Sequence, residues 1–417
     1  MDPNRLDSWK SIASYFGFSQ RTVMRWHAER KLPIHRFPAG RSGSVFAYIS
    51  ELDTWRRGQS SSIQSSERPL ELNFQGDSSF PGRERVAHLW EIRSENNLGE
   101  ILDIYRAGIQ QDWRNASAYA GLACSLLASS SVDLIQGSIA LLQASVAAEK
   151  ALSLDPDQPE AKCAKAWITF WHLRDYAVAT GYFHEALEGK PDCTFAISGQ
   201  IWVYAIQGQR DKASILIDNL IQKSGFSAHS ALVACRVYFL NGELRRALHV
   251  AMEATASRNG GRTIETLGAL SLLLIGNGEK AIRCLQNQAR DFPEDAMVAG
   301  SLGYAYGMSG DYQNAERTYE LLLKMSLERI SGYGYPLAMT ALAIGRHQEA
   351  IEWLEQSFLE ECFHMLTLRS DPIFTTLRGN PRFDRLVQQT QQPSSRVSGI
   401  AIDTVGSREK AACELLK

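Results

Sequence analysis

The chain has 417 residues, which is too long for one compact core and predicts at least two folding units. Its 44% hydrophobic and 22% charged residues are typical of a globular protein and exclude wholesale disorder. The net charge is −2, but the first 60 residues carry +5 and the other 357 carry −7. Only the N-terminal part therefore suits a polyanionic partner.

The ends and the cysteines predict an intracellular environment. The opening residues MDPNRLDSWK lack the basic and apolar regions of a signal peptide. The longest nearly apolar run, at 267–275, is far shorter than the roughly 20 residues of a membrane span. The seven cysteines stand singly without a CxxC pair, so we expect reduced thiols, a cytoplasmic location and no membrane partner.

The first 30 residues predict two short helices. Ser8 can cap a helix through WKSIASYF, Gly17 allows a turn, and Ser19 can cap a second helix through QRTVMRWHAE. Apolar residues fall on one face of each helix. Two short helices that are joined by a glycine turn predict a helix-turn-helix.

Two strand-like runs and a last helix follow. LPIHRFP and SVFAYI flank the turn PAGRSG, which predicts a pair of short strands, or wing. Ser50 can then cap a short helix through ELDTWRRG. The order of elements over residues 5–58 resembles the winged-helix DNA-binding domains of the MerR and excisionase group. Because Gly58 leads into a polar linker over 59–81 instead of a long dimerising helix, the excisionase comparison is the closer one.

This resemblance implies that the N-terminal part binds double-stranded DNA. The second helix would enter the major groove, the wing tip would reach phosphate or the minor groove, and two further basic residues would add attraction. The implied contacts of the second helix are Gln20, Arg21, Thr22 and Arg25. Those of the wing tip are Arg41 and Ser42, and the two further basic residues are Lys31 and Arg36. The alternative is that these residues form an ordinary solvated, charged surface.

A recurring frame fills most of the remaining chain. A small residue recurs at 34- or 35-residue intervals, and about 12 residues before most copies stands a second small or apolar position. Such offsets place residues on the facing stripes of two antiparallel helices. The first small position of the frame is Ala144, Ala179, Ala213, Ala247, Ala281, Ala315 and Ala350.

The frame resembles the tetratricopeptide repeat over residues 82–362. It predicts a mainly α fold, an α-solenoid of about eight helical hairpins that follows the winged helix-turn-helix. A step of 43 residues from Ile101 to Ala144 predicts about nine extra residues, which we place in a longer loop near SSSVDLIQG. The family resemblance implies a superhelix with a concave peptide-binding face.

The C-terminal residues predict a cap and a tail. Two proline-punctuated apolar clusters over 363–390 predict a capping segment on the open end of the solenoid. Residues 391–417 are polar and aperiodic, which predicts a disordered tail.

No chemistry-bearing motif stands out. The sequence lacks a P-loop, GxGxxG, HExxH and GxSxG, and its histidines are dispersed, so we expect no enzyme activity, cofactor or metal site. The inward stripes of the first helices are largely apolar or aromatic, unlike a clamp for a peptide carboxylate. This favours a groove for a protein or peptide, or else side chains that simply close the superhelix. The predicted groove residues are Ile168, Phe195, Trp202, Arg236 and Tyr304.

Together these features predict a DNA-binding transcriptional regulator whose repeats bind or sense a protein partner. Two alternatives stay open at this point. One is an interaction scaffold that does not read DNA sequence, and the other is an excisionase-like factor that bends DNA.

Overall fold

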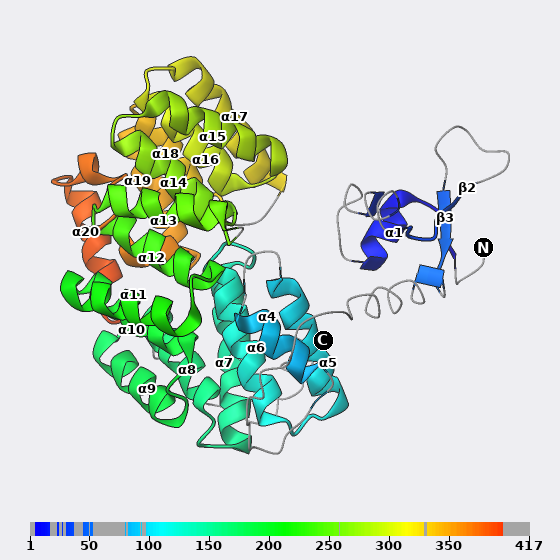
Figure 1. The fold of residues 1–417 in the computed structure, drawn as a ribbon. Helices are drawn as coiled ribbons and strands as arrows, with labels where there is room; N and C mark the ends of the chain where they lie inside the picture. Colours follow the sequence, from blue (N-terminus) through cyan, green and yellow to red (C-terminus); the bar gives the residue numbers. More distant parts are fainter. Residues whose placement is uncertain are drawn as a thin grey trace. The chain divides into compact units, whose positions relative to one another are not determined.

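The computed structural model describes residues 5–16, 23–24, 27, 31–36, 45–49, 51–52, 80, 82–91, 93, 97–257, 259–328 and 332–394. The chain divides into two compact units, Met1–Gly76 and Asp77–Lys417 (Figure 1). The first unit, the head, is small, and the second is the helical body.

The head combines a helix with a small sheet. Its elements are β1 (Arg5–Leu6), α1 (Trp9–Phe16), β2 (His35–Arg36) and β3 (Val45–Tyr48). The sheet order is β1-β3-β2, and both pairings are antiparallel. Ser8 caps α1, since its Oγ accepts a hydrogen bond from the backbone N–H of Ser11 at 3.0 Å. Six apolar side chains form a separate core, Ile12, Val23, Leu32, Val45, Ala47 and Leu52.

The predicted helix over 9–16 and the pairing of the two strand-like runs are confirmed. Strand β1 was not predicted, because two residues are too few to show an alternating pattern. Of the predicted second helix, Val23, Met24 and His27 are helical, and the remainder lies outside the described residues. The complete winged helix-turn-helix therefore stays a prediction.

The body is a solenoid of helical hairpins (Figure 1), which confirms the predicted mainly α repeat architecture. Eight hairpins follow one another in the described part of the body. They are α4 (Arg83–Glu91) with α5 (Leu98–Gln111), α6 (Ala116–Ser130) with α7 (Gly137–Leu154), α8 (Pro159–Ile168) and η1 (Thr169–Leu173) with α9 (Tyr176–Gly189), α10 (Thr194–Ile206) with α11 (Arg210–Ser224), α12 (Ala228–Leu240) with α13 (Leu244–Ala256), α14 (Arg262–Leu274) with α15 (Gly278–Asp291), α16 (Ala296–Met308) with α17 (Tyr312–Glu328), and α18 (Gly334–Ala343) with α19 (His347–Leu359).

The repeat frame is confirmed by burial. All seven small residues of the frame lie in the second helices of their hairpins and have no solvent exposure. Close helix packing explains the need for small residues at such positions. At Gly199, for example, an added Cβ would lie 2.1 Å from the ring of Phe183.

Most hairpins turn through a glycine in the left-handed region. The turns of the last five hairpins place a glycine there, with φ of +74° at Gly208 and +82° at Gly345. The third hairpin has Arg174 at the equivalent position, 34 residues before Gly208, with φ +54°. A non-glycine residue pays a conformational penalty in this region, so other contacts must hold Arg174 there.

Those contacts come from α19 and from the C-terminal segment, residues 363–394, which contains η2 (Phe363–Thr367), η3 (Thr375–Leu377) and α20 (Pro381–Gln391). The Arg174 Nε donates to the carbonyl of Gln392 at 3.3 Å, and its guanidinium lies 4.9 Å from the centroid of the Phe358 ring. Tyr176 Oη donates to the carbonyl of Thr390 at 3.2 Å. The segment therefore reaches back to the third hairpin, beyond the predicted cap on the open end. The predicted start of a disordered tail at residue 391 is wrong, because Gln391 is helical and the Ser394 N–H donates to the Leu173 carbonyl at 2.8 Å; the rest of the predicted tail, from 395, lies outside the described residues.

The second and third hairpins also contact the residues just after α19, at the end of the solenoid. The Trp171 indole donates to the carbonyl of Glu361 at 2.9 Å, and the backbone N–H of Ser138 donates to the carbonyl of Glu360 at 3.3 Å. At Gly137 an added Cβ would lie 2.0 Å from the Glu361 carbonyl oxygen. The solenoid thus closes on itself, and we call these contacts of α7 and of residues 171–176 with residues 358–394 the closure.

Candidate functional site: an inner cavity

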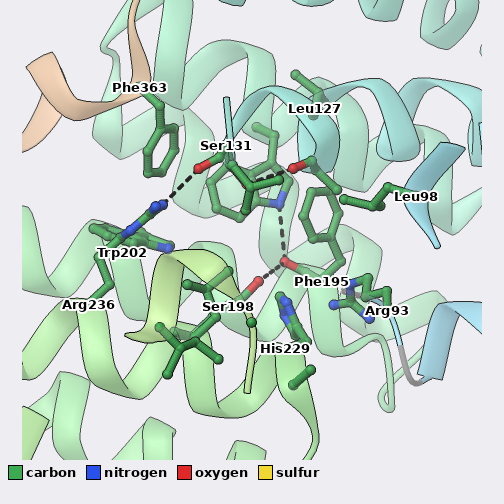
Figure 2. Close-up of a pocket in the computed structure, with 18 residues that line it drawn as sticks. Arg93, Leu98, Leu127, Ser131, Phe195, Ser198, Trp202, His229, Arg236 and Phe363 are labelled. Carbon is green, nitrogen blue, oxygen red and sulfur yellow. Dashed lines mark hydrogen bonds between the residues drawn. The ribbon is translucent and has the colours of Figure 1, made fainter. Parts of the chain in front are cut away.

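An apolar cavity of about 60 Å³ lies on the inner face of the body (Figure 2). The first helices of successive hairpins, α6, α8, α10, α12 and α14, contribute to its wall. The α6–α7 loop (residues 131–136), Phe363 of η2, Arg93, and Leu98 at the start of α5 complete it. We call it the inner cavity.

Aromatic side chains form much of the wall. Trp167 and Phe195 stack with ring centroids 4.9 Å apart, and the Trp167 indole donates to the carbonyl of Phe195 at 3.1 Å. Phe363 packs edge-on against Trp202 at 5.2 Å and against Trp171 at 4.7 Å. These rings are fixed by packing and by hydrogen bonds, so the wall is preorganised.

The cavity has two distinct ends (Figure 2). At one end, the aromatic end, Trp202, Phe363 and Arg236 lie together, and the Arg236 guanidinium is 5.5 Å from the Phe363 ring. At the other, the basic end, Arg93 and His229 lie near Leu98.

The basic end holds two nitrogen-rich side chains in a dry environment. Arg93 is 4% exposed, and its Nη atoms donate to the carbonyl of Trp90 at 2.7 Å and to Thr194 Oγ1 at 3.2 Å. Burial lowers the pKa of Arg93 to about 10, which leaves it cationic at neutral pH. Burial and the charge of Arg93 hold the pKa of His229 well below its ordinary value, so its ring is neutral.

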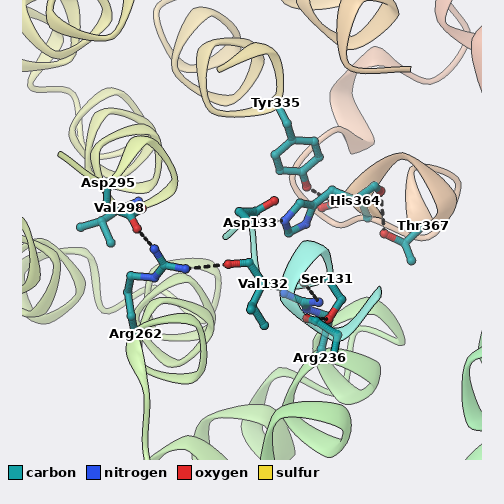
Figure 3. A network of polar contacts seen from close by, with 12 residues as sticks. Ser131, Val132, Asp133, Arg236, Arg262, Asp295, Val298, Tyr335, His364 and Thr367 are labelled. Carbon is teal, nitrogen blue, oxygen red and sulfur yellow. Dashed lines mark hydrogen bonds and ion pairs between the residues drawn. The ribbon is translucent and has the colours of Figure 1, made fainter. Parts of the chain in front are cut away.

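The α6–α7 loop crosses the inner face and is held by two arginines (Figure 3). Arg236 donates to the carbonyl of Ser131 at 2.8 Å, and Arg262 donates to the carbonyl of Val132 at 2.7 Å. Arg262 also pairs with Asp295, whose side chain caps α16. These bonds join the second hairpin to the fifth and sixth, so the loop spans the solenoid. It has six residues, fewer than predicted, because part of the extra length extends α6 and α7.

The tip of the loop meets the C-terminal segment (Figure 3). Asp133, with φ +60°, places its Oδ2 3.1 Å from His364 Nε2. Partial burial raises the pKa of Asp133, but the pairing with His364 outweighs it, and the pKa lies below its ordinary value. His364 in turn stacks on Tyr335 at 4.6 Å, and the Tyr335 hydroxyl donates to Asp371. Burial raises the pKa of Asp371.

The structure brings together three of the five predicted groove residues. Phe195, Trp202 and Arg236 line the inner cavity. Ile168 is half-buried and Tyr304 is buried, and neither lines this cavity. Burial raises the pKa of Tyr304 to about 12, as expected for a core tyrosine.

The predicted DNA contacts fall mostly outside the described residues. This holds for Gln20, Arg21, Thr22, Arg25, Arg41 and Ser42. Lys31 is exposed, with φ +53°, and Arg36 lies in β2, where its backbone alone is described.

Sequence reasoning missed Arg93, His364 and the closing role of Arg174. Only Arg174 carried a signal, because it stands where the later turns have glycine. Arg93 precedes the regular frame, and His364 follows it, so no periodic position drew attention to either residue.

Within the described residues, no group of three or more His, Cys, Asp or Glu side chains is arranged to hold a metal ion. Among the helices that the structure describes, none combines the length and apolar character needed to cross a bilayer.

Comparisons with known proteins give only structural likenesses. No family model matches the chain, and no curated protein matches it. Solved structures do match. The crystal structure of the APC/C hetero-tetramer Cut9-Hcn1 has 16% identity and a TM-score of 0.48, over 74% of this chain and 55% of that one. The chain thus spans little more than half of that relative.

Two further likenesses are similarly distant. A tetratricopeptide repeat protein from Parabacteroides merdae has 13% identity and a TM-score of 0.42, over 65% of this chain and 99% of that one. Yeast Tom70 has 15% identity and a TM-score of 0.42, over 76% and 70%. All three structures are less than 20% identical to this chain, with TM-scores below 0.5.

Proposed function

We propose that the body is a protein-interaction scaffold, and that a partner inserts an apolar side chain into the aromatic end of the inner cavity. The observation that carries this proposal is the meeting of Trp202, Phe363 and Arg236 in one preorganised recess. Tryptophan and arginine in desolvated pockets dominate the binding energy of many interfaces. A cavity of about 60 Å³ is well below the roughly 300 Å³ of ordinary small-molecule pockets, but it can receive part of one side chain.

The experiment is a selection of displayed peptides on the full chain, followed by titration of the recovered peptides. Trp202→Ala and Arg236→Ala should each weaken binding at least about tenfold, as for interface hot spots. Ile168→Val, which lies outside the cavity, is the matched control and should leave the affinity unchanged. Thermal melts establish that each variant is folded. Peptides that bind all variants equally would refute this location.

A second candidate function is the binding of duplex DNA by the head. It is supported by the net charge of +5 over residues 1–60, by the Ser8-capped helix α1, and by the antiparallel pair β2–β3. Because phosphate contacts release counterions, binding should weaken steeply with salt, with a log-log slope of about −0.9 per contact.

Arg21→Ala and Arg25→Ala in the full chain test whether DNA sequence is read. If the second helix contacts base edges, each change should lower affinity for a selected duplex and blur its preference, at about 1–3 kcal/mol for a bidentate contact. Arg41→Ala should weaken all duplexes alike, because phosphates carry no sequence information. If the wild-type chain binds all duplexes equally, sequence-specific DNA binding is refuted and only the scaffold function remains. If it bends the duplex strongly but shows little sequence preference, the excisionase-like architectural factor is favoured.

A further inference from the structure

At the basic end of the inner cavity, the described residues place no anion beside the buried guanidinium of Arg93. Among the described residues, Arg93 donates only to a carbonyl and a hydroxyl, and it stacks over the rings of Trp90 at 4.5 Å and Phe195 at 5.6 Å. Within the described residues it forms no ion pair with a carboxylate. A buried guanidinium is costly unless an anion compensates its charge.

A second group points the same way. His229 lies in the first turn of α12, and its Nε2 is buried and has no hydrogen-bond partner among the described residues. Nε2 of a histidine can donate to an acceptor when it carries the proton. The Nε of Arg93 is likewise buried and without a partner in the described part of the chain. Arg93 and His229, each with one such buried nitrogen, therefore line a cavity whose described wall contains no aspartate or glutamate.

The size and walls of the cavity limit the ligand. Its volume of about 60 Å³ corresponds to roughly four to six water-sized groups, at 10–15 Å³ each. The walls near the two donors, Leu98, Phe195 and Leu232, are apolar. A short hydrocarbon chain that carries one carboxylate satisfies both requirements.

We propose that the basic end of the inner cavity binds a free short-chain carboxylic acid, with its carboxylate between Arg93 and His229 and its hydrocarbon chain against Leu98, Phe195 and Leu232. The carboxylate supplies the charge that Arg93 lacks and accepts hydrogen bonds from both side chains. The carboxylate would lie at the opposite end of the cavity from the proposed protein partner, and the proposal does not depend on that partner, although the two ligands would share the same volume of about 60 Å³.

The test is calorimetric titration of the full chain with butyrate, butyramide and butylamine in the absence of any protein or peptide. Butyrate should saturate a single site with a dissociation constant on the order of 1 mM or lower. Butyramide, which has the same shape without the charge, should bind at least about tenfold more weakly, and butylamine should not bind. Equal binding of butyrate and butyramide, or no saturation by propionate, butyrate or isovalerate, would overturn the proposal.

Variants identify the site. Arg93→Met should abolish butyrate binding while the melting temperature stays equal or rises, because the uncompensated charge is removed. His229→Phe should weaken butyrate binding at least about tenfold. If Arg93→Met does not fold, this variant tests the site in its place. His249→Phe, an exposed position on α13, is the matched control and should bind as the wild type does.

A peptide arm separates this proposal from the scaffold function. Peptides recovered on the aromatic end should still bind Arg93→Met. If peptides that carry glutamate bind in an Arg93-dependent way while no free acid binds, the free-acid proposal is wrong and the scaffold function stands. If free acids bind but no peptide is recovered, the free-acid proposal stands and the proposed scaffold function is wrong.

Discussion

The hairpins from α10 to α17 and the hairpins from α6 to α9 use the same frame of buried alanines, but they make different kinds of contact. The former turn through left-handed glycines and pack chiefly on their neighbours in sequence. The latter have a six-residue loop, an arginine in place of the turn glycine, and bonds to residues up to 231 positions away. Departures from the repeat thus coincide with the contacts that close the solenoid.

The largest expected effect comes from Gly137→Ala, which breaks the closure directly. Its Cβ would lie 2.0 Å from the backbone oxygen of Glu361, so one of the two segments must shift, at a cost of about 3 kcal/mol. Chemical denaturation measures this loss. Gly181→Ala in α9 is the control, because its Cβ meets nothing within 4 Å and should instead add about 1 kcal/mol of helix stability. Equal free energies of unfolding for the two variants would show that the closure does not stabilise the fold.

Ala281→Leu tests the regular hairpins. The residue is fully buried in α15, so the larger side chain should separate packed helices and cost about 2 kcal/mol. Glu279→Leu, two residues earlier and exposed, should be nearly silent in the same denaturation experiment. A silent Ala281→Leu would mean that the repeat register is wrong.

Arg174→Gly compares the two kinds of turn. Glycine relieves the conformational penalty of φ +54°, but the variant loses the hydrogen bond to Gln392 and the contact with Phe358, for a net loss of about 1 kcal/mol. The reciprocal Gly208→Arg incurs the penalty in a turn where an added Cβ meets nothing. Hydrogen exchange should report faster opening of α20 in the first variant only. Unchanged exchange there would argue that Arg174 does not hold the C-terminal segment.

The smallest effect is expected at the tip of the α6–α7 loop. The pKa of Asp133 is lowered in the folded chain, so its pairing stabilises the fold above the ordinary aspartate pKa, and this contribution is lost as the pH falls through the lowered value. About a third of the side chain is exposed (35%), so screening keeps the loss in Asp133→Asn below about 1 kcal/mol. The difference from wild type should be present above the ordinary aspartate pKa of about 4 and should shrink as the pH falls through the lowered pKa of Asp133. A constant difference would exclude the ionised pair.

The sequence predicted the features of the fold that repeat at a regular spacing along the chain. The alanine frame identified the hairpins, and the inward stripes of the first helices predicted a groove of five residues, of which Phe195, Trp202 and Arg236 line the inner cavity. Excess length predicted the loop near Ser131, but its partners Arg236 and Arg262 are 105 and 130 residues away, and no local pattern encodes such a distance. Arg93 was missed for the same reason, because its place beside His229 depends on how separate hairpins stack.

The closure has a consequence for the time course of synthesis. Trp171 donates its hydrogen bond to Glu361, which follows it by 190 residues. At a translation rate of about 5–20 residues per second, the ribosome needs roughly 10–40 s to make that intervening stretch. During this interval the indole of Trp171, 1% exposed in the finished fold, has no C-terminal segment to cover it. The nascent second and third hairpins therefore expose an aromatic surface that chaperones can bind until residues 358–394 have emerged.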